Sequence, residues 1–244
     1  MAATLYVVPG SHPSMAGRLM LEHKGIAYRR IDLIPGLHKP LLRALRFSGT
    51  TVPALRIDGR RIQSSLELSR VLEQMRPEPP LFPSDPEARA RVEEAEAWGE
   101  AVLQPVPRRL SWWALRRDRP AMRSFAEGAR LHVPLGPAIK TAGPIVWAEQ
   151  RINEADDETV RRDLETLPAL LDRVDALLAE GVLGGNPPTA ADYQIATSVR
   201  LLLCFDDLRE GIDERPSGGY SRALVPDFPG RLPRVFPNPW IANL

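Results

Sequence analysis

Three segments in the first third of the chain place hydroxyls or backbone groups where a small thiol could bind. Ser11 and Ser14 form an S-x-x-S pattern between a β-type run and a helical pattern, so Ser11 comes just before a helix N-terminus. A free thiol has a pKa of about 8.5, and a hydroxyl donor at a helix N-terminus favours the thiolate that attacks electrophiles. Ser11 would then donate a hydrogen bond and would not be the nucleophile. The alternative is that Ser11 or Ser14 only caps the helix.

The second segment is Val52-Pro53, at the start of an expected strand. A proline in this position can hold a cis peptide bond, which would turn the Val52 backbone outward to pair with an extended peptide. A trans proline that only leads the strand is the alternative.

The third segment is Ser64-Ser65, which opens an expected helix. A helix N-terminus offers free N–H groups and a positive dipole to a carboxylate. The alternative is a capping box, in which Ser64 caps the helix and Glu67 reaches back. Both functions can hold together.

The first 76 residues have the pattern β-α-β-α-β-β-α. The alternation and the turn residues predict strands at 5–8, 26–33, 52–57 and 60–63, and helices at 14–24, 39–47 and 64–75. The β-α-β opening predicts a parallel pair of strands, and Asp58-Gly59 predicts a tight hairpin turn.

The rest of the chain is expected to be helical after a proline-rich linker. Helices are predicted at 86–104, 156–183 and 189–208, the first ended or kinked by Pro105 and Pro107. Pro168 implies a kink in the second of these helices, or two helices with the later one starting near Thr166. From residue 216 onward the chain has no periodicity, which leaves an ordered loop and a flexible tail as alternatives.

The segment from Thr51 to Leu66 resembles the N-terminal half of the glutathione S-transferases. The resemblance implies that Val52 and Pro53 bind the cysteinyl backbone of glutathione, and that Ser64 and Ser65 bind its γ-glutamyl group. It places Ser11 at the position that contacts the substrate thiol, which makes Ser11 the candidate catalytic residue. Thr189-x-x-Asp192 resembles the capping box in the helical half of that family. No class of the family can be assigned.

The resemblance implies an α/β thioredoxin-like N-terminal domain followed by an all-α helical C-terminal domain. We expect these domains over residues 1–76 and 87–215, a linker over 77–86, and a proline-rich C-terminal tail over 216–244. The family also implies a homodimer and a function in detoxification.

The implied enzyme conjugates a low-molecular-weight thiol with an electrophile, or uses the thiol as a cofactor for isomerisation, dehalogenation or reduction. Trp112 and Trp113 are candidates for lining the acceptor pocket, although helical core is the ordinary place for them. Because acceptor pockets in such folds are built from variable helical side chains, the sequence does not identify the electrophile.

One position departs from the family pattern: Ser64 stands where an acid is usual. The departure removes a partner for the α-amino group of glutathione. Mycothiol is the alternative thiol, if the source is a high-GC actinomycete. A non-catalytic transferase-like module for binding or assembly is the alternative function.

Composition and the remaining motifs exclude several other classes of function. A net charge of +1 favours neither nucleic acid nor an anionic membrane, and the N-terminus shows no signal peptide or membrane span, so we expect a cytoplasmic protein. Cys204, the single cysteine, lies in an apolar helical pattern and is expected to be buried and inert. The four histidines (His12, His23, His38 and His132) have no metal-ligand spacing, so we expect no metal site.

Overall fold

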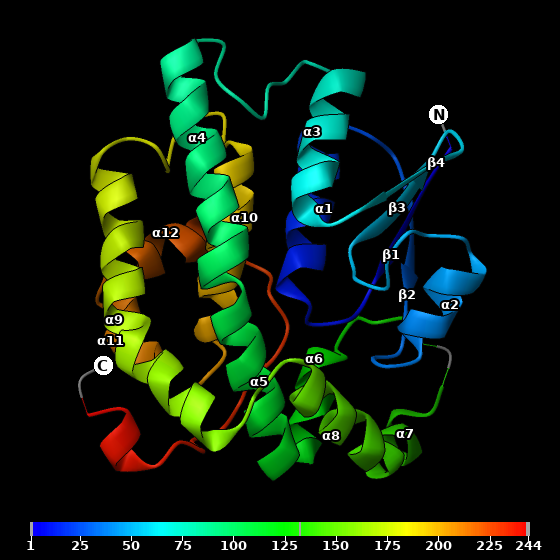
Figure 1. Ribbon diagram of the computed structural model, residues 1–244, viewed down its shortest axis with the longest axis vertical. Helices are drawn as coiled ribbons and strands as arrows, with labels where there is room; N and C mark the ends of the chain where they lie inside the picture. Colours follow the sequence, from blue (N-terminus) through cyan, green and yellow to red (C-terminus); the bar gives the residue numbers. More distant parts are fainter. Residues whose placement is uncertain (1, 132, 243–244) are drawn as a thin grey trace.

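The computed structural model describes residues 2–131 and 133–242. Its N-terminal half is built on a four-stranded sheet with the strand order β2-β1-β3-β4 (Figure 1). The strands β1 and β2 are parallel, and β3 is antiparallel to both of its neighbours, β1 and β4. In sequence order the strands are β1 (Ala3–Val7), β2 (Arg29–Asp32), β3 (Ala54–Ile57) and β4 (Arg60–Gln63).

The alternation of side chains along the strands decides which helix covers which face of the sheet. Leu5 and Leu55, which are partners in the β1–β3 register, lie in one core with residues of α1 (His12–His23) and α3 (Ser65–Met75). Tyr6, one residue along β1, faces the other way and packs in a separate core with α2 (His38–Ala44). The N-terminal half is therefore a sheet with two helices on one face and one on the other, the predicted thioredoxin-like arrangement.

Two N-terminal elements differ in extent from the prediction. The helix α1 begins at His12 instead of residue 14, because Ser11 caps it and Pro13 fits the first turn. The strand β2 covers only Arg29–Asp32, four residues of the predicted 26–33.

The second half of the chain contains no strand among the described residues and is mainly helical. Its α-helices are α4 (Pro86–Trp98), α5 (Pro105–Arg117), α6 (Met122–Phe125), α7 (Leu135–Thr141), α8 (Gly143–Ile152), α9 (Asp157–Ala179), α10 (Ala190–Leu202), α11 (Arg209–Asp213) and α12 (Pro216–Leu224). Shorter 3-10 turns lie at Arg119–Ala121 and Asn238–Trp240. None of the helices in the described part of the chain is long and apolar enough to span a membrane.

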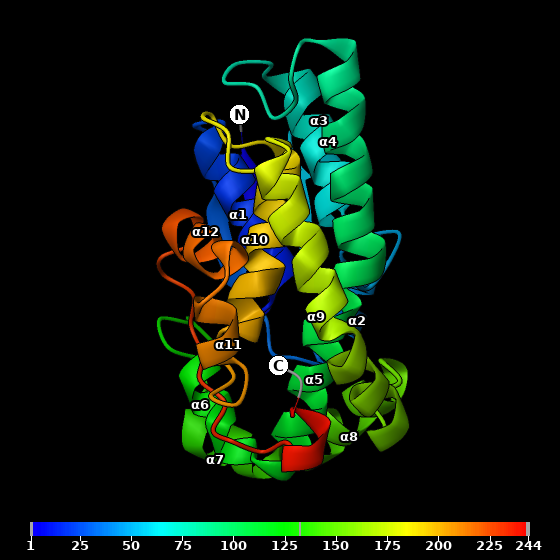
Figure 2. The same cartoon turned by 90° about the vertical axis from the view of Figure 1, so that its left-hand side faces the viewer.

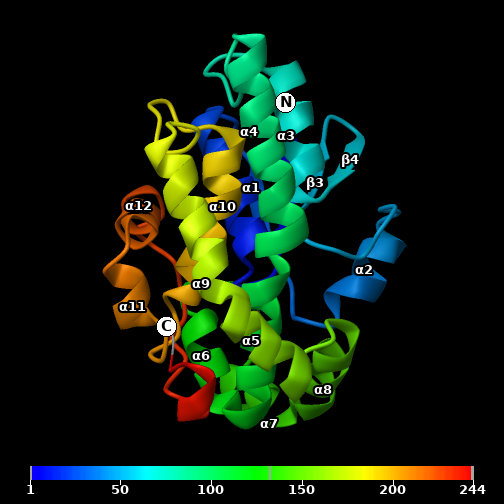
Figure 3. The ribbon, with the colours of Figure 1, turned by 60° about the vertical axis from the view of Figure 1, so that its left-hand side comes forward.

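A π turn, Gly99–Leu103, joins α4 to α5, so the two helices follow one another as a long bent rod (Figure 3). The N–H of Gln104 donates to the carbonyl of Gly99 at 2.8 Å, five residues back. The wider turn lets Pro105 open α5, where a missing N–H costs little. Where the sequence predicted that Pro105 and Pro107 end or kink the helix, the chain therefore changes from a π turn to the α-helix α5.

The helix α9 decides between the two structures predicted around Pro168, and the helix α10 confirms the predicted capping box. The helix α9 is continuous with Pro168 inside it, so the segment is not two helices. The predicted capping box starts α10: the hydroxyl of Thr189 accepts from the N–H of Asp192, and the carboxylate of Asp192 accepts from the N–H of Thr189 at 2.7 Å. The helix α10 ends at Leu202 and not at residue 208, because the chain then turns to form a short bridge between Phe205 and Leu232.

The segment expected to be irregular after residue 216 begins with a helix, α12, which packs against α10. Pro216 stands in the first turn, and Gly218 lies so close to Ile212 that a Cβ on it would meet the Ile212 carbonyl oxygen at 2.1 Å. The prolines and glycines that obscured the periodicity are thus compatible with a helix. After α12, residues 225–242 run along the helical half (Figure 2), and Phe228 and Phe236 in this segment are buried.

The two halves share one continuous core, because α10 packs directly on α1. Every residue of α10 is buried. The side chain of His23 links the halves further, with Nδ1 3.0 Å from the Tyr193 hydroxyl and Nε2 3.0 Å from the carbonyl of Pro80 in the linker.

Candidate functional site

Ser11 lies in the turn between β1 and α1, at the edge of a large cavity. Its Oγ accepts a hydrogen bond from the N–H of Ser14 at 3.3 Å, so Ser11 caps α1. A hydroxyl that accepts one bond still has its own hydrogen to donate. Capping and donation to a bound thiol are therefore compatible. Gly10 makes the turn with φ +74°, and a Cβ there would lie 2.6 Å from Phe125.

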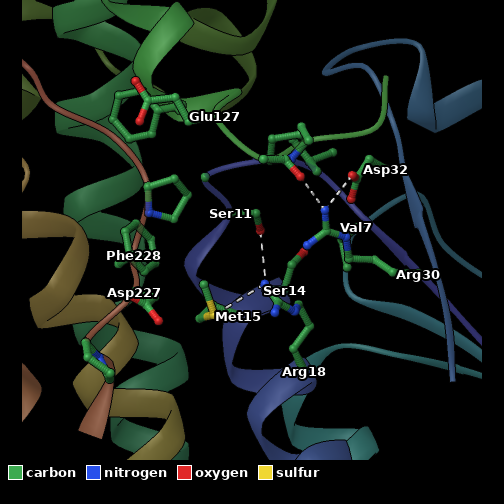
Figure 4. Close-up of a pocket in the computed structure, with 18 residues that line it drawn as sticks. Val7, Ser11, Ser14, Met15, Arg18, Arg30, Asp32, Glu127, Asp227 and Phe228 are labelled. Carbon is green, nitrogen blue, oxygen red and sulfur yellow. Dashed lines mark hydrogen bonds and ion pairs between the residues drawn. The ribbon is translucent and has the colours of Figure 1, made fainter. Parts of the chain in front are cut away.

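Ser14 faces a second, smaller cavity of about 410 Å³, which meets the large one at Ser11. In Figure 4, Ser11 and Ser14 lie at the start of α1, with Asp32 on one side and Phe228 of the C-terminal segment on the other. The Ser14 side chain is buried, and its Oγ has no hydrogen-bond partner in residues 2–131 and 133–242. Arg30 forms an ion pair with Asp32 at 2.9 Å on the far wall.

The Val52-Pro53 peptide bond is cis, as the strand position suggested. Val52 lines the large cavity, and among the described residues its backbone N–H and C=O form no hydrogen bond. Pro53 is buried and packs against α1 at Gly17, where a Cβ would come within 3.2 Å of its ring. Val52 thus presents free backbone to the cavity, and Pro53 holds it in place without lining the cavity itself.

Ser64 and Ser65 differ in their hydrogen bonds. The Oγ of Ser64 accepts from the N–H of Glu67 at 3.2 Å and caps α3, with φ +69° at the cap. Glu67 reaches one residue further back than a capping box requires, to the N–H of Gln63 at 2.9 Å. Ser65 is buried, and its Oγ has no partner in the described part of the chain. Both serines line the large cavity, so Ser65 has a free hydroxyl beside the first N–H groups of α3.

The large cavity has a volume of about 670 Å³ and extends from Ser11, Val52 and Ser65 into the helical half. Its helical wall is largely apolar, which suits an organic ligand. The apolar lining residues include Trp112, Leu115, Phe125, Leu131, Ile139 and Ile145.

Only one of the two candidate tryptophans lines this cavity. Trp112 does. Trp113 is 1% exposed and points into the core, where it stacks on Phe236 at a ring distance of 5.3 Å. Its indole N–H donates to Asp157 at 2.8 Å. Successive residues of a helix point in directions about 100° apart, so Trp113 cannot share the face of Trp112. The prediction for Trp113 is wrong.

The cavity also contains charged residues that sequence reasoning missed. Lys39 forms an ion pair with Glu149 at 2.6 Å. Burial raises the pKa of Glu100, whose buried Oε2 has no hydrogen-bond partner among the described residues. Arg108 donates from Nη2 to the side-chain oxygen of Gln104, and burial lowers the pKa of its guanidinium. The sequence did contain one indication of these residues. Glu100, Gln104 and Arg108 precede Trp112 at intervals of four residues, the spacing of side chains on one face of a helix.

His12 is buried beside this row of residues, and its Nε2 lies 3.2 Å from the carbonyl of Gln104. Burial holds the pKa of His12 well below its ordinary range, so the ring is neutral and Nε2–H donates to that carbonyl. In the described residues, no three His, Cys, Asp or Glu side chains gather as metal ligands; His132 lies outside those residues.

Cys204 is buried, as predicted, and its Sγ lies 3.5 Å from the carbonyl of Arg200. Burial raises the pKa of this thiol to about 11, so it stays protonated at neutral pH. Its burial and protonation make it an inert core residue.

Comparison with known proteins finds one matching family model and one shared fold. Residues 5–80 match the model of the glutathione S-transferase N-terminal domain. No curated protein sequence matches the chain.

Several solved structures share its fold. A glutathione transferase from Populus trichocarpa is 17% identical, with a TM-score of 0.60, over 92% of this chain and 93% of that one. A glutathione transferase homologue from Sulfitobacter, solved with bound glutathione, is 18% identical, with a TM-score of 0.58 and 93% coverage of each chain. A maleylacetoacetate isomerase from Anaeromyxobacter dehalogenans, holding dicarboxyethyl glutathione and citrate, is 21% identical, with a TM-score of 0.55 and 92% coverage of each chain.

Proposed function

We propose that this chain, which has the glutathione S-transferase fold and that family's N-terminal domain, binds glutathione and activates its thiol against an electrophile. The observation that carries the proposal is the meeting of three unsatisfied groups in one cavity. These are the donor capacity of the Ser11 hydroxyl, the free backbone of Val52 and the unpartnered hydroxyl of Ser65. Each suits a different part of a γ-glutamyl thiol peptide.

The peptide part of glutathione is recognised by the sheet side of the cavity. An extended peptide can pair with the N–H and C=O of Val52 as an added strand. The γ-glutamyl carboxylate accepts from the Ser65 hydroxyl and from N–H groups at the start of α3, where the helix dipole favours an anion. Glu100 supplies the carboxylate for the α-amino group, in place of the acid absent at Ser64.

The chemical step needs only a stabilised thiolate. The thiol loses its proton to solvent, and the Ser11 O–H donates a hydrogen bond to the sulfur, aided by the N-terminus of α1. Each unit by which the thiol pKa falls corresponds to about 1.4 kcal/mol. The sulfur then forms a bond to the electrophilic carbon, and the leaving group departs with its electron pair. Isomerisation, dehalogenation and reduction are variants that use the same thiol adduct.

The test is a calorimetric titration of the full-length protein with glutathione, and with mycothiol in parallel. We expect saturable glutathione binding that Ser65→Ala weakens about tenfold, which corresponds to one lost hydrogen bond to a charged group. Ser11→Ala should bind glutathione but turn over chlorodinitrobenzene at least about tenfold more slowly than the wild type. Ser48→Ala, a serine outside the cavity, is the control for both measurements.

The outcomes separate the alternatives. Binding of mycothiol alone would keep the mechanism and change the thiol. Binding of neither thiol would overturn the proposal and favour a non-catalytic module for binding or assembly. A homodimer, a cytoplasmic location, a function in detoxification and the domain boundaries at 76 and 87 stay predictions from the family resemblance.

A further inference from the structure

Arg108 lies on the helical side of the large cavity, between Gln104 and Trp112 on the same face of α5. Its Nη2 donates to the side-chain oxygen of Gln104, which carries no charge. In the part of the chain that the structure describes, no carboxylate lies within ion-pair distance of this guanidinium, whereas Arg70, Arg109 and Arg215 each have one.

The two acids nearest to Arg108 in the cavity do not neutralise it by contact. Both carboxylate oxygens of Glu149 already have partners. One forms an ion pair with Lys39 at 2.6 Å, and the other lies 3.3 Å from the side-chain nitrogen of Asn153. Glu100 lies in the π turn eight residues before Arg108, and its charge attracts the guanidinium from beyond ion-pair distance.

Arg108 is half-buried, and withdrawing a cation from water is costly unless an opposite charge, such as that of a bound ligand, compensates it. A guanidinium binds a carboxylate through two parallel N–H···O bonds, which adds geometric specificity to the charge. The helical wall that carries Arg108 also contributes Trp112, Leu115 and Ile139 to the lining of the same cavity. The cavity therefore offers an unpaired cation together with apolar surface.

We infer that the electrophile accepted by this cavity is an apolar molecule carrying a carboxylate, which pairs with Arg108 while its body packs against Trp112. This inference rests on the proposed thiol chemistry for the reaction, but the Arg108 site itself can be tested without a thiol. It names the acceptor class that the sequence left open.

The first experiment measures binding of S-hexylglutathione and S-carboxypentylglutathione to the full-length protein by calorimetry. The two probes share the thiol part and differ at the end of the alkyl chain. We expect the wild type to prefer the carboxylate probe by about tenfold. Arg108→Met should abolish the preference, and Arg108→Lys should retain part of it. Arg116→Met, an exposed arginine of the same helix, should leave it unchanged.

A second pair of probes, phenylbutyrate and its neutral amide, separates this inference from the proposed function. We expect phenylbutyrate to bind about tenfold more tightly than the amide, again only while Arg108 is present. If neither glutathione probe binds but phenylbutyrate shows this dependence, the thiol proposal is wrong and the carboxylate site stands. Equal affinity of the wild type for both members of each pair, or a preference that persists in Arg108→Met, would overturn the inference.

Discussion

Lys24, at the junction of the two halves, is a buried cation, and Arg108, in the large cavity, is a half-buried one in the opposite environment. The amine of Lys24 is fully buried and has three acceptors: the carboxylate of Glu73 at 2.5 Å, the carbonyl of Pro77 at 3.1 Å and the carbonyl of Pro79 at 2.6 Å. Arg108 has one neutral acceptor, the amide of Gln104.

The difference shows that a cation withdrawn from solvent can support the fold in one region and ligand binding in another. At the junction, Lys24 satisfies acceptors of the linker, and Glu73 also accepts from the N–H of Leu81 at 2.9 Å, so the linker is held against the N-terminal half. In the cavity, the charge of Arg108 is left for a ligand. A saturated buried cation stabilises the fold, whereas an unsaturated one carries specificity.

Glu96, where α3 and α4 meet, is an intermediate case. Its Oε2 accepts from Arg70 at 2.5 Å, but its buried Oε1 has no partner among the described residues. Burial outweighs the attraction of Arg70 and raises the pKa of Glu96 from 4.5 to about 7. The three groups therefore form a series from saturated to unsaturated, and each can be tested by removing its charge.

The largest effect is expected at the saturated site. Lys24→Met leaves the Glu73 carboxylate without its counter-ion and two carbonyls without their donor, so the free energy of unfolding should fall by about 3 kcal/mol or more. Urea denaturation followed by circular dichroism measures the change. Lys140→Met, at an exposed lysine, should change it by less than about 0.5 kcal/mol. A loss below about 1 kcal/mol in Lys24→Met would show that the junction does not depend on this cation.

An intermediate effect is expected at Glu96, and it depends on pH. Because the pKa is higher in the folded protein, the folded state holds the proton more tightly, and this contribution is fully present below about pH 4.5. It should decline as the pH rises to about 7, by about 3 kcal/mol in total.

Urea denaturation across this pH range, compared between the wild type and Glu96→Gln, measures the contribution. The glutamine variant should lose this part of the pH dependence, while Glu94→Gln, at an exposed position two residues earlier in α4, should keep it. Parallel pH profiles for the wild type and Glu96→Gln would contradict the prediction.

The smallest effect on stability is expected at the unsaturated site. Arg108→Met removes an unpaired, half-buried charge and keeps an apolar chain, so the free energy of unfolding should stay within about 1 kcal/mol of the wild type or rise. Thermal unfolding of the ligand-free protein measures it. A destabilisation above about 2 kcal/mol would mean that Arg108 is part of the fold's support, and the comparison with Lys24 would fail.

The thiol side of the site could be predicted from the sequence because its features are local. Ser11 and Ser65 are tied to helix starts, and Val52 to a strand-leading proline, so a few adjacent residues determine where each lies. The order of strands and helices in the first 76 residues followed from the same short-range patterns. The helix at residues 216–224 was missed because its prolines and glycines hide a pattern that packing against α10 supports.

Only the tertiary structure decided the acceptor side. Trp112 and Trp113 are neighbours in the sequence. The orientation of α5 relative to the C-terminal segment places Trp112 in the cavity wall and Trp113 in the core. The pairing of Lys39 with Glu149 leaves Arg108 without a counter-ion, and those residues come from α2, α8 and α5. The sequence by itself determined the local elements and the groups that they expose. Which charges meet, and which stay unpaired, depends on long-range packing that no short segment encodes.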